Sequence, residues 1–125
     1  AKAHQAKIDG DKYLEVWGSG KPKREFLFID DLADALIHLI KHYSGNIQIN
    51  VGTGKDISIR ETAELMCRVV GFNGELKFDA SMPDGSPRKL LDVNRLTELG
   101  WTAKTSLNDG LNETYNWYLK NYVNS

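Results

Sequence analysis

The chain has 125 residues, of which 41% are hydrophobic, and this is enough for one domain with one core. Its formal net charge of −1 argues against a nucleic-acid partner, because nucleic-acid-binding domains are usually strongly basic. No apolar run approaches the roughly 20 residues of a membrane-spanning helix, and the single cysteine, Cys67, favours a reducing compartment. We therefore expect a cytoplasmic protein that binds neither membranes nor nucleic acid.

Strand-like and helix-like patterns alternate along the chain. The strand segments are short and rich in β-branched and aromatic residues, whereas the helical segments repeat apolar residues at helical spacing. In chain order we predict a helix end at 1–8, strands at 13–17 and 24–29, a helix from Asp30 or Asp31 to about Tyr43, a strand at 47–51, a helix from Ser58 to Val70, a strand at 75–78, a brief helix capped by Asp92 and a last helix from Ser106. This order indicates a small α/β unit with a small sheet.

The helix starts differ in their capping signals. Ser58 with Glu61 forms a Ser-x-x-Glu capping box, and Ser106 with Asp109 marks the start of the last helix. Residues 1–8 are helical in character but have no capping residue ahead of them. We interpret this uncapped start as the cut end of a longer chain.

Two polar segments have the stiffness expected of ligand-binding loops. Residues 81–92 contain two prolines, an Asp-Gly turn, one arginine and one lysine. Residues 16–26 contain a Gly-Ser-Gly-Lys-Pro-Lys loop between two predicted strands. Together these segments predict a pocket for an anionic ligand that contains a ring.

Five side chains of these segments are candidates for contact with such a ligand. Arg24 can hold phosphate oxygens through two parallel hydrogen bonds, or it is a solvated surface arginine. Trp17 can stack on a base or a sugar, or it packs in the core. Asp84 can accept two donors of a base or a ribose, or it satisfies the backbone of its own turn. Arg88 and Lys89 can neutralise a diphosphate, or they are ordinary surface charges.

The sequence lacks a complete catalytic, cofactor-binding or metal-binding motif. The Gly-x-Gly turns at 18–20 and 52–54 lack the third glycine of a dinucleotide fingerprint, and no tyrosine has a lysine four residues later. His38 and His42 share a helix face without the glutamate of a metal motif, and Cys67 has no histidine nearby. We therefore expect no catalytic, cofactor-binding or metal-binding residue in this chain.

Three blocks of the sequence resemble the C-terminal part of the GDP-L-fucose synthase family. These enzymes are GDP-4-keto-6-deoxy-mannose 3,5-epimerase/4-reductases and belong to the extended short-chain dehydrogenase/reductases. The blocks are residues 16–35, Asn-Val-Gly-Thr-Gly at 50–54, and residues 78–92, followed by Leu-Gly-Trp at 99–101. The Arg-Glu-Phe…Asp-Asp pattern of the first block indicates only the wider nucleotide-sugar group. The Pro-Asp-Gly-x-Pro-Arg-Lys-Leu-Leu-Asp pattern of the third block is far more specific to this family.

The resemblance implies that residues 1–125 are the substrate-binding lobe, without the N-terminal Rossmann domain. It places Trp17, Arg24 and Asp84 at substrate-contacting positions, with Lys89 as a weaker candidate. NADP(H), the Ser/Thr-Tyr-Lys set, and the cysteine and histidine of epimerisation would all belong to the absent N-terminal part. The full-length enzyme would act on a GDP-sugar as a homodimer, and the chain alone is expected to be inactive.

Two alternatives remain open. The chain could be the substrate lobe of another nucleotide-sugar epimerase or reductase, acting on a UDP- or dTDP-sugar, or a non-catalytic α/β nucleotide-binding module. The lobe interpretation predicts exposed apolar surface where the rest of the protein would pack. The module interpretation predicts a self-contained domain that melts cooperatively.

Overall fold

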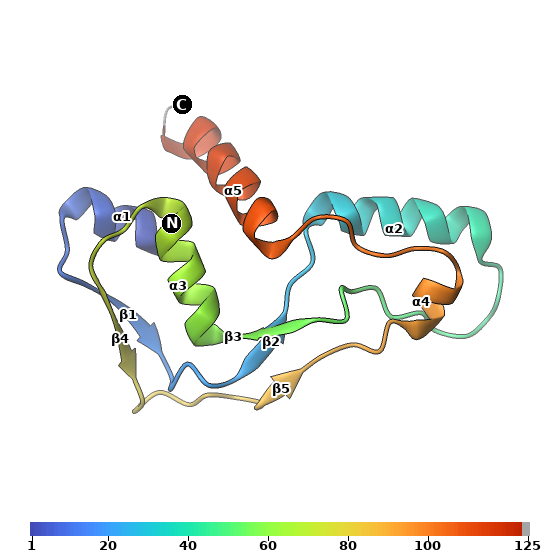
Figure 1. The fold of residues 1–125 in the computed structure, drawn as a ribbon, viewed down its shortest axis with the longest axis horizontal. Helices are drawn as coiled ribbons and strands as arrows, with labels where there is room; N and C mark the ends of the chain where they lie inside the picture. The colour runs from blue at the N-terminus through green and yellow to red at the C-terminus, as the bar shows by residue number, and fades with distance from the viewer. Residues whose placement is uncertain (124–125) are drawn as a thin grey trace.

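The computed structural model describes residues 1–123, which form helices and two small sheets (Figure 1). The helices are α1 Lys2–Asp9, α2 Ile29–His42, α3 Ile59–Val70, α4 Asn94–Glu98, α5 Leu107–Tyr118 and the π-helical turn η1 Leu119–Val123. The strands are β1 Tyr13–Trp17, β2 Lys23–Glu25, β3 Asp56–Ser58, β4 Glu75–Asp79 and β5 Arg88–Lys89. This mixture confirms the predicted α/β class, and none of these helices has the length and apolar character to cross a bilayer.

The strands form two separate sheets. Strands β1 and β4 make a parallel pair, and the other sheet has the order β3-β2-β5, in which β2 is antiparallel to β3 and parallel to β5. In Figure 1 the pair β1–β4 lies with α1 and α3 at one end of the molecule, α2 and α4 lie at the other end, and the three-stranded sheet lies between them. The two sequence blocks that carry the candidate residues therefore meet at the central sheet.

Two hydrophobic clusters replace the single core expected from the chain length. The first cluster consists of Ala6, Cys67 and Phe72, with Leu14 and Leu76 packed against it. The second consists of Ala35, Leu96 and Trp101, with five partly buried side chains around it: Leu27, Leu39, Ile49, Val51 and Ala103. One cluster lies at each end of the central sheet.

The capping predictions for α3 and α5 are confirmed. The Ser58 hydroxyl accepts from the Glu61 amide, and the Glu61 carboxylate accepts from the Ser58 amide, which completes the capping box. The Ser106 hydroxyl accepts from the Asp109 amide in the same way at the start of α5. These starts are predictable because both partners lie within three residues of each other.

The predicted aspartate cap of α2 is wrong, because the N-cap is Phe28, without a side-chain hydrogen bond. The N-cap of α4 is Val93, one residue after the predicted Asp92, but the Asp92 carboxylate does accept from the Asn94 amide at the start of this helix. Asp31 lies in the first turn of α2, where its carboxylate accepts from the backbone amides of Lys104 and Thr105. The Asp31 carboxylate, which the local sequence predicted as a helix cap, therefore binds a distant segment of the chain instead.

Two predicted strands are also corrected. Strand β2 ends at Glu25, so residues 26–28 leave the sheet, and residues 47–51 form no strand in the described part of the chain. Leu27, Ile49 and Val51 pack instead against the second cluster. Their apolar patterns therefore reflect burial against a helix and not pairing within a sheet.

The apolar side chains of α2 are only partly covered. Ala35 is fully buried, but Ile29, Leu36, Ile37 and Ile40 are all at least half exposed. Such an exposed apolar face is what the lobe interpretation predicts.

Candidate functional site

The three-stranded sheet places like charges opposite each other. In the parallel pair β2–β5, Lys23 lies opposite Arg88 and Arg24 lies opposite Lys89. Because residues opposite each other project from the same face of a sheet, each face carries two neighbouring cations. Like charges in this arrangement repel, so negative charge on either face would stabilise the pair.

On one face the protein supplies that negative charge itself. Arg88 Nε donates to Asp56 Oδ2, and this hydrogen bond holds the pKa of the Asp56 carboxyl below its ordinary value. The Asp56 side chain is largely buried, whereas that of Arg88 is exposed. Arg88 is therefore an ion-pair partner within the sheet.

On the other face the cations have no acidic partner among residues 1–123. Arg24 is half-buried, and its Nη1 donates to the carbonyl oxygens of Lys23 at 2.7 Å and Ser86 at 2.8 Å. Lys89 is exposed, and neither residue forms an ion pair within the described chain. Arg24 thus holds the loop before β5 while its positive charge remains uncompensated.

Asp84 ties the loop between β4 and β5 to the turn that follows β1. Its Oδ1 accepts from the Ser19 amide at 2.6 Å, and its Oδ2 accepts from the Ser19 hydroxyl at 2.7 Å. These hydrogen bonds, that of the hydroxyl above all, hold the pKa of Asp84 below its ordinary value. A Cβ atom at Gly18, where φ is +85°, would collide with the same carboxylate, so the turn requires glycine there.

Trp17 lies at the surface and not in a core. Its side chain is 62% exposed, its Nε1 donates to Glu15 Oε1 at 3.1 Å, and Lys2 Nζ lies 5.6 Å from its ring centroid. The core-packing alternative for this residue is therefore wrong. The indole thus interacts with Glu15 of its own strand and with Lys2 of α1.

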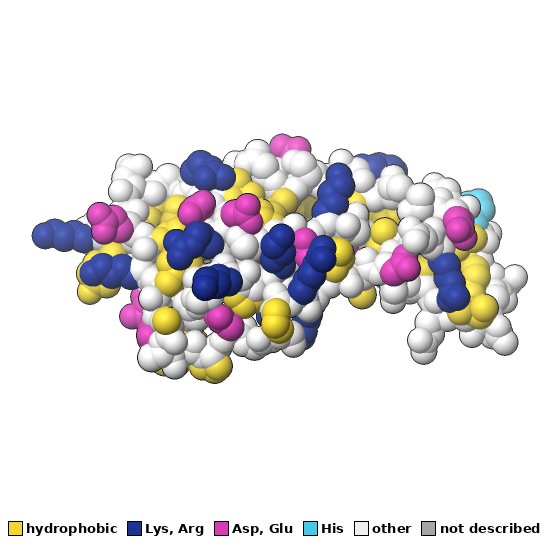
Figure 2. Space-filling model, turned by 60° about the horizontal axis from the view of Figure 1, so that its bottom comes forward, with side chains coloured by type: hydrophobic (Ala, Val, Ile, Leu, Met, Phe, Trp, Pro, Cys, Tyr) yellow, Lys and Arg dark blue, Asp and Glu magenta, His cyan; other side chains and the backbone are white. Residues whose placement is uncertain are grey.

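The four predicted residues therefore lie on neighbouring segments without forming one enclosed cavity. Arg24 and Lys89 are opposite each other, Asp84 is two residues from the Ser86 carbonyl that Arg24 binds, and Trp17 precedes the Gly18 turn. Figure 2 shows the face that is lowest in Figure 1, where Lys and Arg side chains gather near the middle with acidic side chains among them. These four residues thus lie on an open surface that carries both positive and negative charge, which we call the charged ledge.

Both Gly-x-Gly turns bind carboxylates of the protein. The Ser19 amide of the first turn donates to Asp84, and the Thr53 and Gly54 amides of the second donate to Glu25. These amides are the groups that would have to face the phosphates of a dinucleotide. The turns in residues 1–123 therefore do not fit the phosphates of NADP(H).

The remaining chemically active side chains have structural partners. Cys67 is buried in the first cluster, and burial raises the pKa of its thiol, so it is held as a thiol. His38 Nε2 donates to the Leu99 carbonyl at 2.7 Å, and its ring lies 4.5 Å from that of His42. Within residues 1–123 no group of three His, Cys, Asp or Glu side chains is placed to hold a metal ion.

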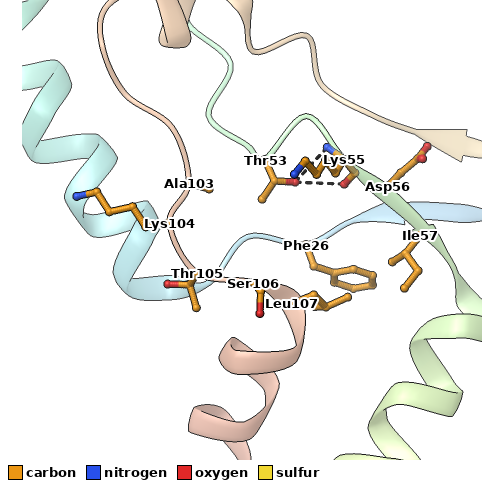
Figure 3. A pocket seen from close by; sticks show the side chains of 10 residues that line it. All are labelled: Phe26, Thr53, Lys55, Asp56, Ile57, Ala103, Lys104, Thr105, Ser106 and Leu107. Carbon is orange, nitrogen blue, oxygen red and sulfur yellow. Dashed lines mark hydrogen bonds between the residues drawn. The ribbon is translucent and has the colours of Figure 1, made fainter.

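A cavity of about 400 Å³ lies beside the sheet, between β3 and the start of α5 (Figure 3). In Figure 3 Phe26 lies between Ile57 and Leu107, whereas Lys104 lies on the far side, next to α2. None of Trp17, Arg24, Asp84 and Lys89 lines this cavity. It is therefore separate from the charged ledge.

Two residues that organise the ledge were not predicted from the sequence. Ser19 holds Asp84, and Glu25, next to Arg24, binds amides of two distant segments. The available signal for Glu25 was a carboxylate next to Arg24 at the start of the otherwise apolar segment 24–29. The partners of both residues lie far away in the sequence, so spacing could not reveal them.

The comparisons with known proteins agree with this architecture. The NAD dependent epimerase/dehydratase family matches residues 1–52. The solved structure of a GDP-6-OMe-4-keto-L-xylo-heptose reductase from C. jejuni superimposes with a TM-score of 0.87 and 34% identity, over 95% of this chain and 45% of that one. The fold is thus part of an extended short-chain dehydrogenase/reductase fold, as predicted.

The sequence matches point to one group within that class. Arabidopsis thaliana GDP-L-fucose synthase 1 is 54% identical over 121 residues, which are 97% of this chain and 38% of the relative. A GDP-L-fucose synthetase from Naegleria fowleri, solved with NADP bound, is 29% identical with a TM-score of 0.91, over 99% of this chain and 39% of that one. These matches confirm the resemblance to the GDP-L-fucose synthases, and the chain spans less than half the length of these relatives.

Proposed function

We propose that residues 1–125 form the C-terminal, GDP-sugar-binding region of a GDP-L-fucose synthase. The full-length protein would epimerise GDP-4-keto-6-deoxy-mannose at C3 and C5 and reduce its ketone with NADPH, which would bind outside these residues. The names of the relatives support this proposal. The observation that carries it is the pair Arg24 and Lys89, two cations opposite each other on one sheet face with no acidic partner in residues 1–123.

A diphosphate supplies the negative charge that this face lacks. Arg24 uses only Nη1 in its hydrogen bonds within residues 1–123, which leaves Nη2 and Nε as donors for phosphate oxygens. Lys89 adds a mobile point charge from the neighbouring strand. Anion binding between them would relieve the repulsion that their register imposes.

The other two candidates would orient the rest of the ligand. The exposed indole of Trp17 offers a flat surface for a base or a sugar ring. Asp84 holds the loop and the Gly18 turn together, and its oxygens keep acceptor capacity for a ligand hydroxyl or ring N–H. The contribution of this region would be to fix the nucleotide and thereby position the distant sugar for reaction.

Titration calorimetry on the full-length protein tests the proposal. We expect GDP to bind more tightly than UDP or dTDP, and Lys89→Ala or Arg24→Ala to weaken GDP binding by about tenfold or more, as for loss of a charged hydrogen bond. Lys23→Ala is the matched control, because that lysine lies on the opposite face of β2 and its side chain forms no hydrogen bond or ion pair within residues 1–123. Unchanged GDP affinity in Lys89→Ala and Arg24→Ala would overturn the proposed site, and tighter UDP or dTDP binding would indicate a different nucleotide-sugar enzyme.

A second measurement tests whether the 125-residue chain lacks catalytic activity by itself. The purified 125-residue chain should show no reduction of the GDP-keto-sugar with NADPH, because its Gly-x-Gly turns are occupied by Asp84 and Glu25. Detectable turnover by this chain would contradict the proposal.

A further inference from the structure

We infer that Glu25 is a positioning residue, whose carboxylate sets the placement of Lys89 beside Arg24. The inference rests on the proposed diphosphate site. Glu25 follows Arg24 on β2, and because successive strand residues project to opposite faces, its side chain lies on the face away from the proposed ligand. It therefore acts through other residues and does not contact the ligand.

One carboxylate joins three segments of the chain. Glu25 Oε1 accepts from the Thr53 amide at 2.5 Å and the Gly54 amide at 2.7 Å, with the Thr53 hydroxyl at 3.3 Å. Glu25 Oε2 accepts from the Leu91 amide at 2.9 Å. The end of β2 is thereby fixed both to the turn before β3 and to the segment after β5.

The Gly-Thr-Gly turn is shaped around this carboxylate. A Cβ atom at Gly52 would collide with Glu25 Oε1 and press on the Leu91 side chain, and Gly54 has a φ of +69°. Two consecutive amides directed at one oxygen form an anion-binding arrangement. The anion bound here is the protein's own Glu25, which explains a phosphate-loop-like sequence that lacks the third glycine.

Glu25 affects the proposed site through β5, the short strand that carries Lys89. Only Arg88 and Lys89 pair with β2, so the ladder alone holds this strand weakly. Leu91 lies two residues after Lys89, and its hydrogen bond to Glu25 is the next attachment of this segment to β2. Without this attachment the Lys89 side chain would sample more positions relative to Arg24, and the diphosphate would have to order it on binding.

The substitution Glu25→Gln in the full-length protein tests this role. Glutamine keeps the size of the side chain but presents an NH₂ group to one of the two sets of donors, so either Leu91 or the 52–54 turn loses its acceptor. We expect the KM for the GDP-sugar and the Kd for GDP to rise about tenfold, with kcat changed less than about twofold. An unchanged GDP affinity would overturn the inference.

Asp31→Asn is a matched control. Asp31 accepts from the Lys104 amide at 3.1 Å, the Thr105 amide at 2.8 Å and the Thr105 hydroxyl at 3.1 Å. These are two consecutive amides and a threonine hydroxyl, the same kinds of donor that the 52–54 turn offers to Glu25. It belongs to α2 and touches neither β2 nor β5 through these bonds. We expect Asp31→Asn to lower Tm while leaving the Kd for GDP unchanged, whereas a comparable loss of GDP affinity in this control would show that the effect of Glu25→Gln is merely structural.

A double-substitution cycle with Lys89→Ala separates the two proposals. If Glu25 acts through Lys89, Glu25→Gln should weaken GDP binding little further once Lys89 is alanine. Full additivity would overturn the positioning role alone, whereas no effect of Lys89→Ala and Arg24→Ala on GDP binding would overturn the diphosphate site itself. Glu25→Asp, which keeps the charge but is too short to reach both segments, replaces Glu25→Gln in the same cycle if that variant does not fold.

Discussion

The two hydrophobic clusters are both buried, but the helices that carry them differ in how completely their apolar side chains are covered. The cluster of Ala6, Cys67 and Phe72 lies where α1, α3 and the parallel pair β1–β4 contact one another. The cluster of Ala35, Leu96 and Trp101 is also buried and lies where α2 faces α4 and nearby loops (Figure 1), but Leu36, Ile37 and Ile40 of the same helix are at least half exposed. The difference shows that the apolar surface of α2 is wider than the surface that residues 1–123 offer to it.

The largest expected effect is in the cluster of Ala6, Cys67 and Phe72. Phe72 is only 6% exposed, and Phe72→Ala removes a whole ring from a site enclosed on several sides. We expect the free energy of unfolding to fall by about 4 kcal/mol, measured by urea unfolding of the 125-residue chain. Phe72→Leu should lose less than half of that, and a loss below about 1 kcal/mol for Phe72→Ala would remove the distinction between the clusters.

Leu96→Ala probes the cluster that packs against α2 and should have the next largest effect. Leu96 is 1% exposed, so its removal leaves a cavity, but α2 can shift toward that cavity because apolar residues on its other side, such as Ile40, are exposed. We expect a loss of about 2.5 kcal/mol in the same unfolding assay, toward the lower end of the range for buried leucines. Leu36→Ala, on the exposed face of α2, is the control. A larger loss of unfolding free energy for Leu96→Ala than for Phe72→Ala would contradict the expected order of the two clusters.

Ser19→Ala probes the connection between the turn after β1 and the loop before β5. Removal of the hydroxyl takes away the main cause of the lowered pKa of Asp84, so that pKa should rise toward its ordinary value in an NMR titration. A lowered folded-state pKa stabilises the protein above the ordinary aspartate pKa, and this contribution disappears as pH falls through the folded-state value. The variant should therefore lose less stability on acidification.

Ser81→Ala is the matched control for that titration. Ser81 lowers the pKa of Asp79 through the same kind of hydroxyl hydrogen bond, at the start of the same loop. It should raise the pKa of Asp79 and leave that of Asp84 unchanged. An unchanged Asp84 pKa in Ser19→Ala would show that the Ser19 hydroxyl does not hold this carboxylate in solution.

The smallest effect is expected on the outer face of α2. Ile40 is 82% exposed, so Ile40→Gln should change the free energy of unfolding of the 125-residue chain by less than about 0.5 kcal/mol. The same substitution should cost more in the full-length protein if further residues cover this face there. A cost above about 1 kcal/mol in the chain itself would show that the face is already covered.

The local elements were largely predictable because their causes lie within a few residues. The capping box of Ser58 and Glu61 occurs where the sequence predicts it, and Gly10 and Gly71, whose left-handed backbone ends α1 and α3, directly follow these helices in the sequence. The strand predicted at 47–51 failed because Ile49 and Val51 are apolar for a different reason, which is contact with the second cluster. An apolar pattern shows that a segment is buried, but not what buries it.

By itself, the sequence determined the α/β class, most helix boundaries, the resemblance to the GDP-L-fucose synthases and the two loops that carry the candidate residues. Only the tertiary structure decided that Arg24 lies opposite Lys89, that Ser19 holds Asp84 from 65 positions away, and that Glu25 occupies the Gly-Thr-Gly turn. The reason is physical: capping and turn formation depend on neighbours along the chain, whereas strand register and carboxylate–amide contacts depend on which distant segments the two clusters bring together.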